Sequence, residues 1–109
     1  MKTPIHDIQA EHHEWEQANF PDKKPHQPVF GMVEEVGELC HALLKSEQCI
    51  RGDAEKHQAD AKDAIGDVFI YMLSFCTMNG WSFTEIAEET WEQVKARDWK
   101  RNPESGSSG

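Results

Sequence analysis

Apolar side chains recur along the chain with the period of an α-helix, and no segment shows the strict alternation of a half-buried strand. The helical period holds in four segments, which are separated by polar or proline-containing connections. These segments cover about residues 4–18, 28–46, 54–78 and 83–102. The pattern therefore predicts an all-α protein with four helices.

Residues that favour helix starts support these limits. Thr3 is expected to cap the first helix, with Pro4 at its first helical position. Asp53 is expected to cap the third helix, and Ser82 or Thr84 to open the fourth. The predicted boundaries thus follow from cap chemistry as well as from periodicity.

The connections between the segments restrict how the helices are arranged. Asn19–Pro28 contains three prolines and can be neither a regular helix nor a central strand. The connection at Glu47–Gly52 and the stop signal Asn79-Gly80 are both short. Short connections favour antiparallel neighbours, so we expect a four-helix, antiparallel, bundle-like protomer.

Composition limits the size of the domain and the kinds of partner. The chain has 109 residues, and one domain is expected over residues 1–103. Residues 104–109 include the flexible-linker sequence SGSSG and are expected to form a tail that resembles an artificial linker. The net charge of −9 argues against nucleic-acid binding, which needs a basic surface. No apolar run approaches the roughly 20 residues that a membrane span needs.

The cysteines suggest a reducing environment. The three cysteines form no CxxC pair, and an odd number fits no closed disulfide framework. Cys40 and Cys76 lie within apolar helical pattern and are interpreted as small core residues. A cytoplasmic location is therefore expected.

The second helix carries an acidic stripe at the border of its apolar face. Gly31, Glu35, Glu38 and Ala42 follow one another at spacings of 4, 3 and 4 residues. Both carboxylates therefore point the same way, between two positions with almost no side chain. This predicts a polar notch with room for a ligand. Glu34 points farther round the helix and is interpreted as solvated, as a support behind the ligands or as an alternative ligand.

The third helix carries a second acidic stripe. Asp67 is the only charged residue of the run AIGDVFIYMLSFCTM, where an unpaired carboxylate would be costly. Asp60, Asp63 and Asp67 lie within about 60° of one another on the helical wheel, and Tyr71 continues that face. Antiparallel packing would place this stripe opposite the glutamates of the second helix.

So many carboxylates around one gap need cations. An all-oxygen cluster without cysteine suits a hard divalent ion, Mg²⁺ or Mn²⁺. The alternative is two solvated acidic faces with one salt bridge to Asp67. Glu38-Leu-Cys-His41 has the Glu-x-x-His spacing of di-iron bundles, but no second such motif exists, so His41 is interpreted as a surface residue. His12-His13 lacks the rest of a zinc motif and is interpreted as polar surface.

Together these residues resemble the MazG-like, all-α nucleoside triphosphate pyrophosphohydrolase family. Glu35-Val-Gly-Glu38, within EEVGEL, matches the Glu-x-x-Glu of that family, and Asp67, within GDVFIYML, matches the aspartate of its second acidic motif. HQP before the acidic helix and RDWKRNP near the end of the chain also match. One position departs from the motif, because Ala64 stands where the family has a glutamate. Asp63 or Asp60 must then take that role.

The resemblance implies Mg²⁺- or Mn²⁺-dependent hydrolysis of (deoxy)nucleoside triphosphates to a monophosphate and pyrophosphate, as in nucleotide-pool housecleaning. It implies Glu35 or Glu38 as the catalytic residue that directs the attacking water. The implied metal ligands are Glu35, Glu38, Asp63 and Asp67, with Asp60 as an alternative.

Further residues are candidates for substrate contacts. The resemblance implies base and sugar contacts from His26, Gln27, Phe30 and Tyr71. Phosphates need positive side chains, and the late basic cluster with Lys95 and Lys100 is the best supply. The alternative is that these cations stabilise a helix C-terminus.

Alternatives remain for function and assembly. A phosphoribosyl-ATP pyrophosphatase-like enzyme and a non-catalytic helical interaction module both fit, and Ala64 gives weight to the second. The sequence does not rank nucleotides or give the number of metal ions. The third helix is apolar nearly all round and needs cover on several sides, so a homodimer or homotetramer is expected. The four tryptophans are interpreted as core or subunit-interface residues.

Overall fold

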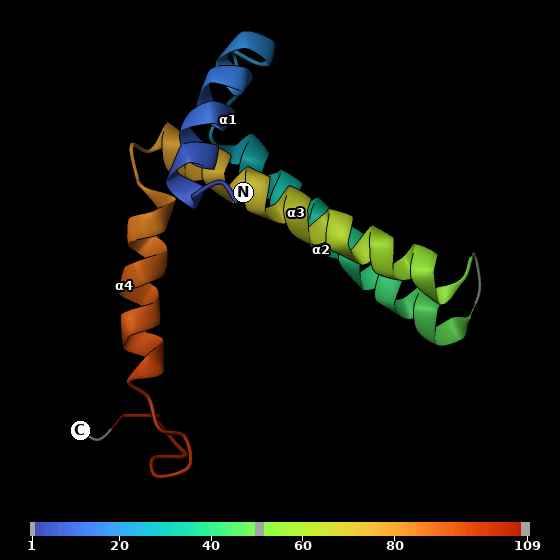
Figure 1. Cartoon of the computed structure of the whole chain (residues 1–109), viewed down its shortest axis with the longest axis vertical. Coiled ribbons are helices and arrows are strands. Elements are labelled where there is room, and N and C mark those ends of the chain that lie inside the picture. The colour runs from blue at the N-terminus through green and yellow to red at the C-terminus, as the bar shows by residue number, and fades with distance from the viewer. Residues whose placement is uncertain (1, 50–51, 108–109) are drawn as a thin grey trace.

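A computed structural model describes residues 2–49 and 52–107 and contains four α-helices in this part of the chain (Figure 1). They are α1 (Ile5–Asn19), α2 (His26–Gln48), α3 (Ala54–Met78) and α4 (Phe83–Lys95). None of the described residues forms a strand, so the predicted all-α class is confirmed. No helix within the described ranges combines the length and the apolar character needed to cross a membrane.

Two predicted N-caps are present. The Asp53 carboxylate accepts a hydrogen bond from the backbone N–H of Lys56 at 2.8 Å, and α3 begins directly after it. The Ser82 hydroxyl accepts one from the backbone N–H of Glu85 at 3.3 Å. Ser82 rather than Thr84 therefore opens α4. Each cap satisfies a backbone donor that the first turn of a helix leaves unpaired.

The predicted start of the first helix was wrong by one residue. Pro4 is the N-cap itself, with an extended backbone (ψ 148°), and no side chain caps the helix there. The carbonyl of Pro4 accepts the backbone N–H of Ile8 at 3.1 Å. Thr3 therefore lies outside the helix and does not cap it.

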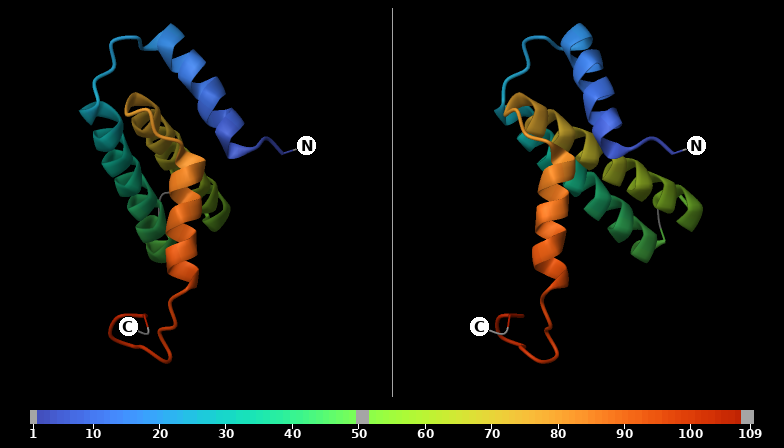
Figure 2. Two further views of the ribbon diagram at one scale, coloured as in Figure 1. Left: turned by 90° about the vertical axis from the view of Figure 1, so that its left-hand side faces the viewer. Right: turned by 60° about the vertical axis from the view of Figure 1, so that its left-hand side comes forward.

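The helices do not close into the predicted bundle within one protomer. α2 and α3 form a long antiparallel hairpin, α1 crosses its open end, and α4 extends away from it (Figures 1 and 2). The radius of gyration is 17.6 Å, whereas a compact domain of this length has about 13 Å. The shape is open, because no other helix of the described part of the chain packs along the length of α4.

The core of the protomer is small. Its buried apolar residues are Pro28 and Ala42 on α2 with Ala64, Leu73 and Cys76 on α3. Cys76 is thus a core residue as predicted, whereas Cys40 is exposed and that prediction was wrong. The four tryptophans are 50–59% exposed, so they are not core residues of this protomer.

A polar side chain fixes α1 across the end of the hairpin. Gln9 donates to the hydroxyl of Thr77 at 3.1 Å and to the carbonyl of Trp81 at 2.9 Å, and its own carbonyl accepts the backbone N–H of Phe83 at 2.9 Å. One amide therefore ties α1 to the end of α3 and to the start of α4.

The segment after α4 folds back on itself. The backbone N–H of Asp98 donates to the carbonyl of Gly106 at 2.7 Å. Gly106 has φ +75°, and a Cβ there would lie 2.9 Å from the ring of Trp99. A glycine is therefore required at this turn. The expected boundary between the domain and the tail at residue 104 stays a prediction.

Candidate metal centre

The α2–α3 hairpin brings all six predicted carboxylates to one groove of about 480 Å³. The two stripes face each other because the helices are antiparallel and each stripe repeats at three or four residues. Ala42 and Ala64, both buried, lie in the seam between the helices and border the groove. The carboxylates that line it are Glu34, Glu35, Glu38, Asp60, Asp63 and Asp67.

Glu34 lies in the groove, which corrects the expectation that it points elsewhere. It borders the same hollow as Glu35 and Glu38, and its negative charge contributes to the raised pKa of Glu35. A residue next to Glu35 lies about 100° round the helix. The long side chain of a glutamate is flexible enough to reach back across that angle.

Glu35 is the carboxylate most affected by its neighbours. Partial desolvation raises its pKa above the usual value, and the charges of Asp67, Glu34, Glu38 and Asp63 raise it further, in that order. Desolvation and like charges both disfavour the ionised form. A cation in the groove would reverse this effect.

Asp60 already has a cation. Its carboxylate accepts a hydrogen bond from the ammonium of Lys56 at 2.8 Å, and this bond lowers the pKa of Asp60. Asp63 makes none of the ion pairs found among the described residues. Of the two candidates to replace the glutamate missing at Ala64, Asp63 is therefore the one with its charge unpaired.

The chemistry of the groove fits a magnesium ion that is shared with a substrate. Among the described side chains, no three acidic, histidine or cysteine groups converge into a ready-made metal cage. Mg²⁺ is often held by only one or two carboxylates, together with water and substrate phosphates. Oxygen donors in an open groove suit that mode of binding.

The predicted notch beside Gly31 is filled by Tyr71. A Cβ on Gly31 would lie 2.6 Å from the ring of Tyr71, closer than carbon atoms pack. The ammonium of Lys23 lies 5.0 Å from the centroid of the same ring. The ring of Tyr71 therefore occupies the room that was expected beside Gly31 and forms a wall of the hollows next to it.

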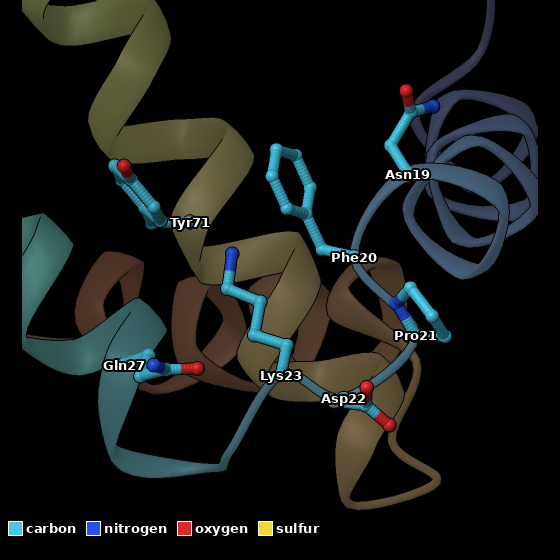
Figure 3. A pocket seen from close by; sticks show the side chains of 7 residues that line it. All are labelled: Asn19, Phe20, Pro21, Asp22, Lys23, Gln27 and Tyr71. Carbon is cyan, nitrogen blue, oxygen red and sulfur yellow. The ribbon is translucent and has the colours of Figure 1, made fainter.

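Two hollows beside this wall were missed by sequence reasoning. The larger, about 550 Å³, lies between the α1–α2 connection and α3 (Figure 3). The smaller, about 250 Å³, extends from Trp15 to Glu35 and Asp67. Both are bordered by Phe20, Lys23 and Tyr71. The run NFPDK was the sequence signal that could have pointed to these hollows, but it was interpreted only as a connection that is not helical.

The predicted base and sugar contacts fall into two groups. Gln27 and Tyr71 border the larger hollow. His26 and Phe30 lie outside it and pack against each other, with ring centroids 5.3 Å apart. Phe30 is 67% exposed. The structure therefore brings two of the four to the larger hollow, and none of the four lines the acidic groove.

The predicted phosphate contacts lie away from the groove in the protomer. Lys95, in the last turn of α4, pairs with Glu92 at 2.6 Å. Lys100 follows α4, and its backbone N–H donates to the Asp98 carboxylate at 3.2 Å. Neither lysine borders the acidic groove, because α4 extends away from the hairpin (Figure 1).

The comparisons with known proteins agree with this geometry. No curated protein and no solved structure matches the chain. Residues 24–101 match the MazG nucleotide pyrophosphohydrolase domain, a span that includes both acidic stripes and the hairpin that joins them. The chain therefore belongs to the MazG nucleotide pyrophosphohydrolase family.

Proposed function

We propose that this protein hydrolyses (deoxy)nucleoside triphosphates to a nucleoside monophosphate and pyrophosphate, as a nucleotide-pool housecleaning enzyme. The observation that carries the proposal is the groove of six facing carboxylates within the span that matches the family. A protein with net charge −9 can accept a polyphosphate only where a cation offsets the repulsion.

The candidate metal ligands in this proposal are Glu35, Glu38, Asp63 and Asp67. A Mg²⁺ or Mn²⁺ ion would use one or two of them, together with water and substrate phosphates. When bound there, the ion supplies charge neutralisation and polarisation of the phosphate oxygens. Glu34 borders the groove as a support or alternative ligand. Asp60 is the weaker candidate because Lys56 already binds its carboxylate.

Glu35 or Glu38 directs the attacking water. Glu35 is favoured over Glu38 as the proton acceptor, because Glu35 borders both the acidic groove and the smaller hollow that leads to Lys23. Its carboxylate oxygen would orient the water and hold the proton that the water loses. Direct attack by water needs no covalent intermediate.

The active form is a homodimer or homotetramer in this proposal. On α2, the apolar residues Val33, Val36, Leu43 and Leu44 are 47–69% exposed. On α4, Trp91 is 59% exposed. Burial of this apolar surface by other copies of the chain would provide the core that one protomer lacks.

The test is pyrophosphate release from a panel of nucleoside triphosphates and deoxynucleoside triphosphates, each with Mg²⁺ and with Mn²⁺. The panel includes phosphoribosyl-ATP, the substrate of the alternative enzyme. We expect release from at least one deoxynucleoside triphosphate and none in the presence of a chelator. Release from phosphoribosyl-ATP alone would favour the alternative enzyme. No release from any substrate would favour a non-catalytic module.

A further inference from the structure

A buried carboxylate fixes the connection between α1 and α2 to α3. Glu16 is only 3% exposed. Its carboxylate accepts the hydroxyl of Ser74 at 2.7 and 3.0 Å, and the ammonium of Lys23 lies 3.2 Å from Oε2. A buried carboxylate needs such partners because desolvation penalises its charge. Lys23 is therefore held at a defined place rather than free in solvent.

Lys23 is the cation of this cluster. His12 also lies near Glu16, with Nε2 3.8 Å from Oε2. Burial lowers the pKa of His12, and the charge of Lys23 lowers it further against the opposing effect of Glu16. The histidine is thus neutral at pH 7, and the lysine carries the positive charge.

The ammonium of Lys23 has hydrogen-bonding capacity left over. An ammonium has three donors, and the one hydrogen bond from Lys23 to another side chain goes to Glu16. Figure 3 shows the side chain rising from the connection, with its nitrogen between Phe20 and Tyr71. The side chain is 18% exposed, so part of it remains open to a ligand.

The position of Lys23 joins the acidic groove to the larger hollow. Lys23 borders the smaller hollow, which reaches Glu35 and Asp67, and also the larger one. At the other end of the groove, Lys56 is paired with Asp60. Lys23 therefore lies between the carboxylates and the larger hollow, where a phosphate of a bound nucleotide that spans the two would lie.

The larger hollow suits a nucleoside. Its volume of about 550 Å³ lies within the roughly 300–1,000 Å³ of small-molecule sites. Phe20 offers an aromatic ring on which a base can stack, whereas the ring of Tyr71 is covered by the ammonium of Lys23. The amide nitrogen of Asn19 donates to the carbonyl of Trp15, and the amide oxygen of Gln27 accepts the backbone N–H of Lys24. The amide oxygen of Asn19 and the amide nitrogen of Gln27 are left for a base.

We propose that the larger hollow binds the nucleoside monophosphate half of the substrate, with Lys23 on its α-phosphate and Glu16 as the residue that positions Lys23. This inference rests on the proposed function, because it assumes that the pyrophosphate half lies at the carboxylates. It replaces Lys95 and Lys100 by a lysine of the same protomer as the α-phosphate contact.

The experiment is isothermal titration of the intact protein, in buffer with Mg²⁺, with the deoxynucleoside monophosphates and their matching nucleosides. Monophosphates are products rather than substrates, so the readout is affinity and not turnover. We expect every deoxynucleoside monophosphate that binds the protein to have a higher affinity than its matching nucleoside. Lys23→Met should weaken monophosphate binding by roughly tenfold or more, the loss of one charge-assisted hydrogen bond. It should leave nucleoside binding unchanged.

The neighbouring lysine gives a matched control. Lys24 is exposed and borders neither hollow, so Lys24→Met should keep the wild-type affinities. Because Lys23→Met leaves Glu16 without its cation, the double variant Glu16→Gln with Lys23→Met repeats the test without an unpaired buried charge. Unchanged preference for the monophosphates in both variants would overturn the inference, as would absence of any nucleotide binding.

This result is separable from that of the proposed function. If pyrophosphate release fails while monophosphate binding depends on Lys23, the hydrolase proposal falls and the monophosphate site stands. If release succeeds and Lys23→Met binds monophosphates like the wild type, the hydrolase proposal stands and the assignment of Lys23 falls.

Discussion

At the scale of single residues, the ionisation of Glu35 determines how the metal-free groove affects the stability of the fold. Partial desolvation, followed by the charges of four other carboxylates, raises its pKa above the ordinary 4.5. A raised carboxyl pKa in the folded protein favours folding below the unfolded-state value, and that contribution is lost as the pH rises through the folded-state value. At neutral pH, the ionised Glu35 therefore opposes folding of the metal-free protein.

Glu35→Gln should raise the Tm of the metal-free protein at pH 7. The difference from wild type should shrink as the pH falls, and it should vanish below the unfolded-state pKa of about 4.5. Thermal unfolding followed by circular dichroism, in chelator and over a pH series, measures this. Glu14→Gln, at an exposed position on α1 outside the groove, is the control and should leave the Tm unchanged. A lower Tm for Glu35→Gln at pH 7 would contradict the repulsion inferred in the groove.

The carboxylates of the groove could be predicted from local periodicity, whereas the cluster around Glu16 could not. Residues three and four apart on a helix share a face whatever the tertiary structure, so both acidic stripes could be placed from spacing. Glu16 and Ser74 are 58 residues apart, and no repeat in the sequence relates them. For the same reason His12 was interpreted as surface, although its side chain is only 9% exposed.

At the scale of helices, the close approach of α2 and α3 depends on small residues at the seam. Gly31 leaves space for the ring of Tyr71, and Ala42 and Ala64 are buried between the two helices. Ala64 stands where the family motif has a glutamate. In this chain that position serves packing at the edge of the groove, and the carboxylates next to it carry the charge.

Gly31→Ala should destabilise the protein, whereas Gly37→Ala on the same helix should stabilise it. A Cβ at Gly31 meets the Tyr71 ring at 2.6 Å, while none of the described neighbours lies within 4 Å of a Cβ at Gly37. Alanine in an open helical position gains roughly 0.5–1 kcal/mol over glycine. Overpacking costs roughly 1–3 kcal/mol, which exceeds that gain.

Urea unfolding of both variants measures these changes in the free energy of unfolding. Equal stabilisation by the two alanines would show that Tyr71 does not pack on Gly31. Gly31→Ala should also weaken nucleotide binding, because the displaced ring borders both hollows.

At the scale of the whole molecule, the four predicted helices are present, but the fourth ends at Lys95 rather than near residue 102, and a single chain buries little of its apolar surface. The four helices and the caps at Asp53 and Ser82 follow from local signals. The apolar face of α2 is largely exposed, with Val33 at 69% and Leu43 at 58%. Periodicity identifies an apolar face but does not say whether the same chain or another copy covers it.

The assembly should therefore be larger than the protomer of 12.5 kDa. Sedimentation velocity should give twice or four times this mass for the wild type. Leu43→Glu, which places a charge in the exposed apolar arc, should shift the protein toward the monomer. Gln17→Glu, at an exposed polar position on α1, should not. A wild-type monomer at all concentrations would contradict the proposed assembly.

The most direct test of the central claim is the identity of the products. The protein is incubated with Mg²⁺ and a deoxynucleoside triphosphate that it hydrolyses, and the products are identified by ³¹P nuclear magnetic resonance. The account predicts pyrophosphate and a nucleoside monophosphate from the wild type. It predicts no product from Glu38→Gln or from Asp67→Asn, with the helical circular dichroism of both variants retained. A nucleoside diphosphate with orthophosphate, or undiminished turnover by the folded Asp67→Asn variant, would contradict it.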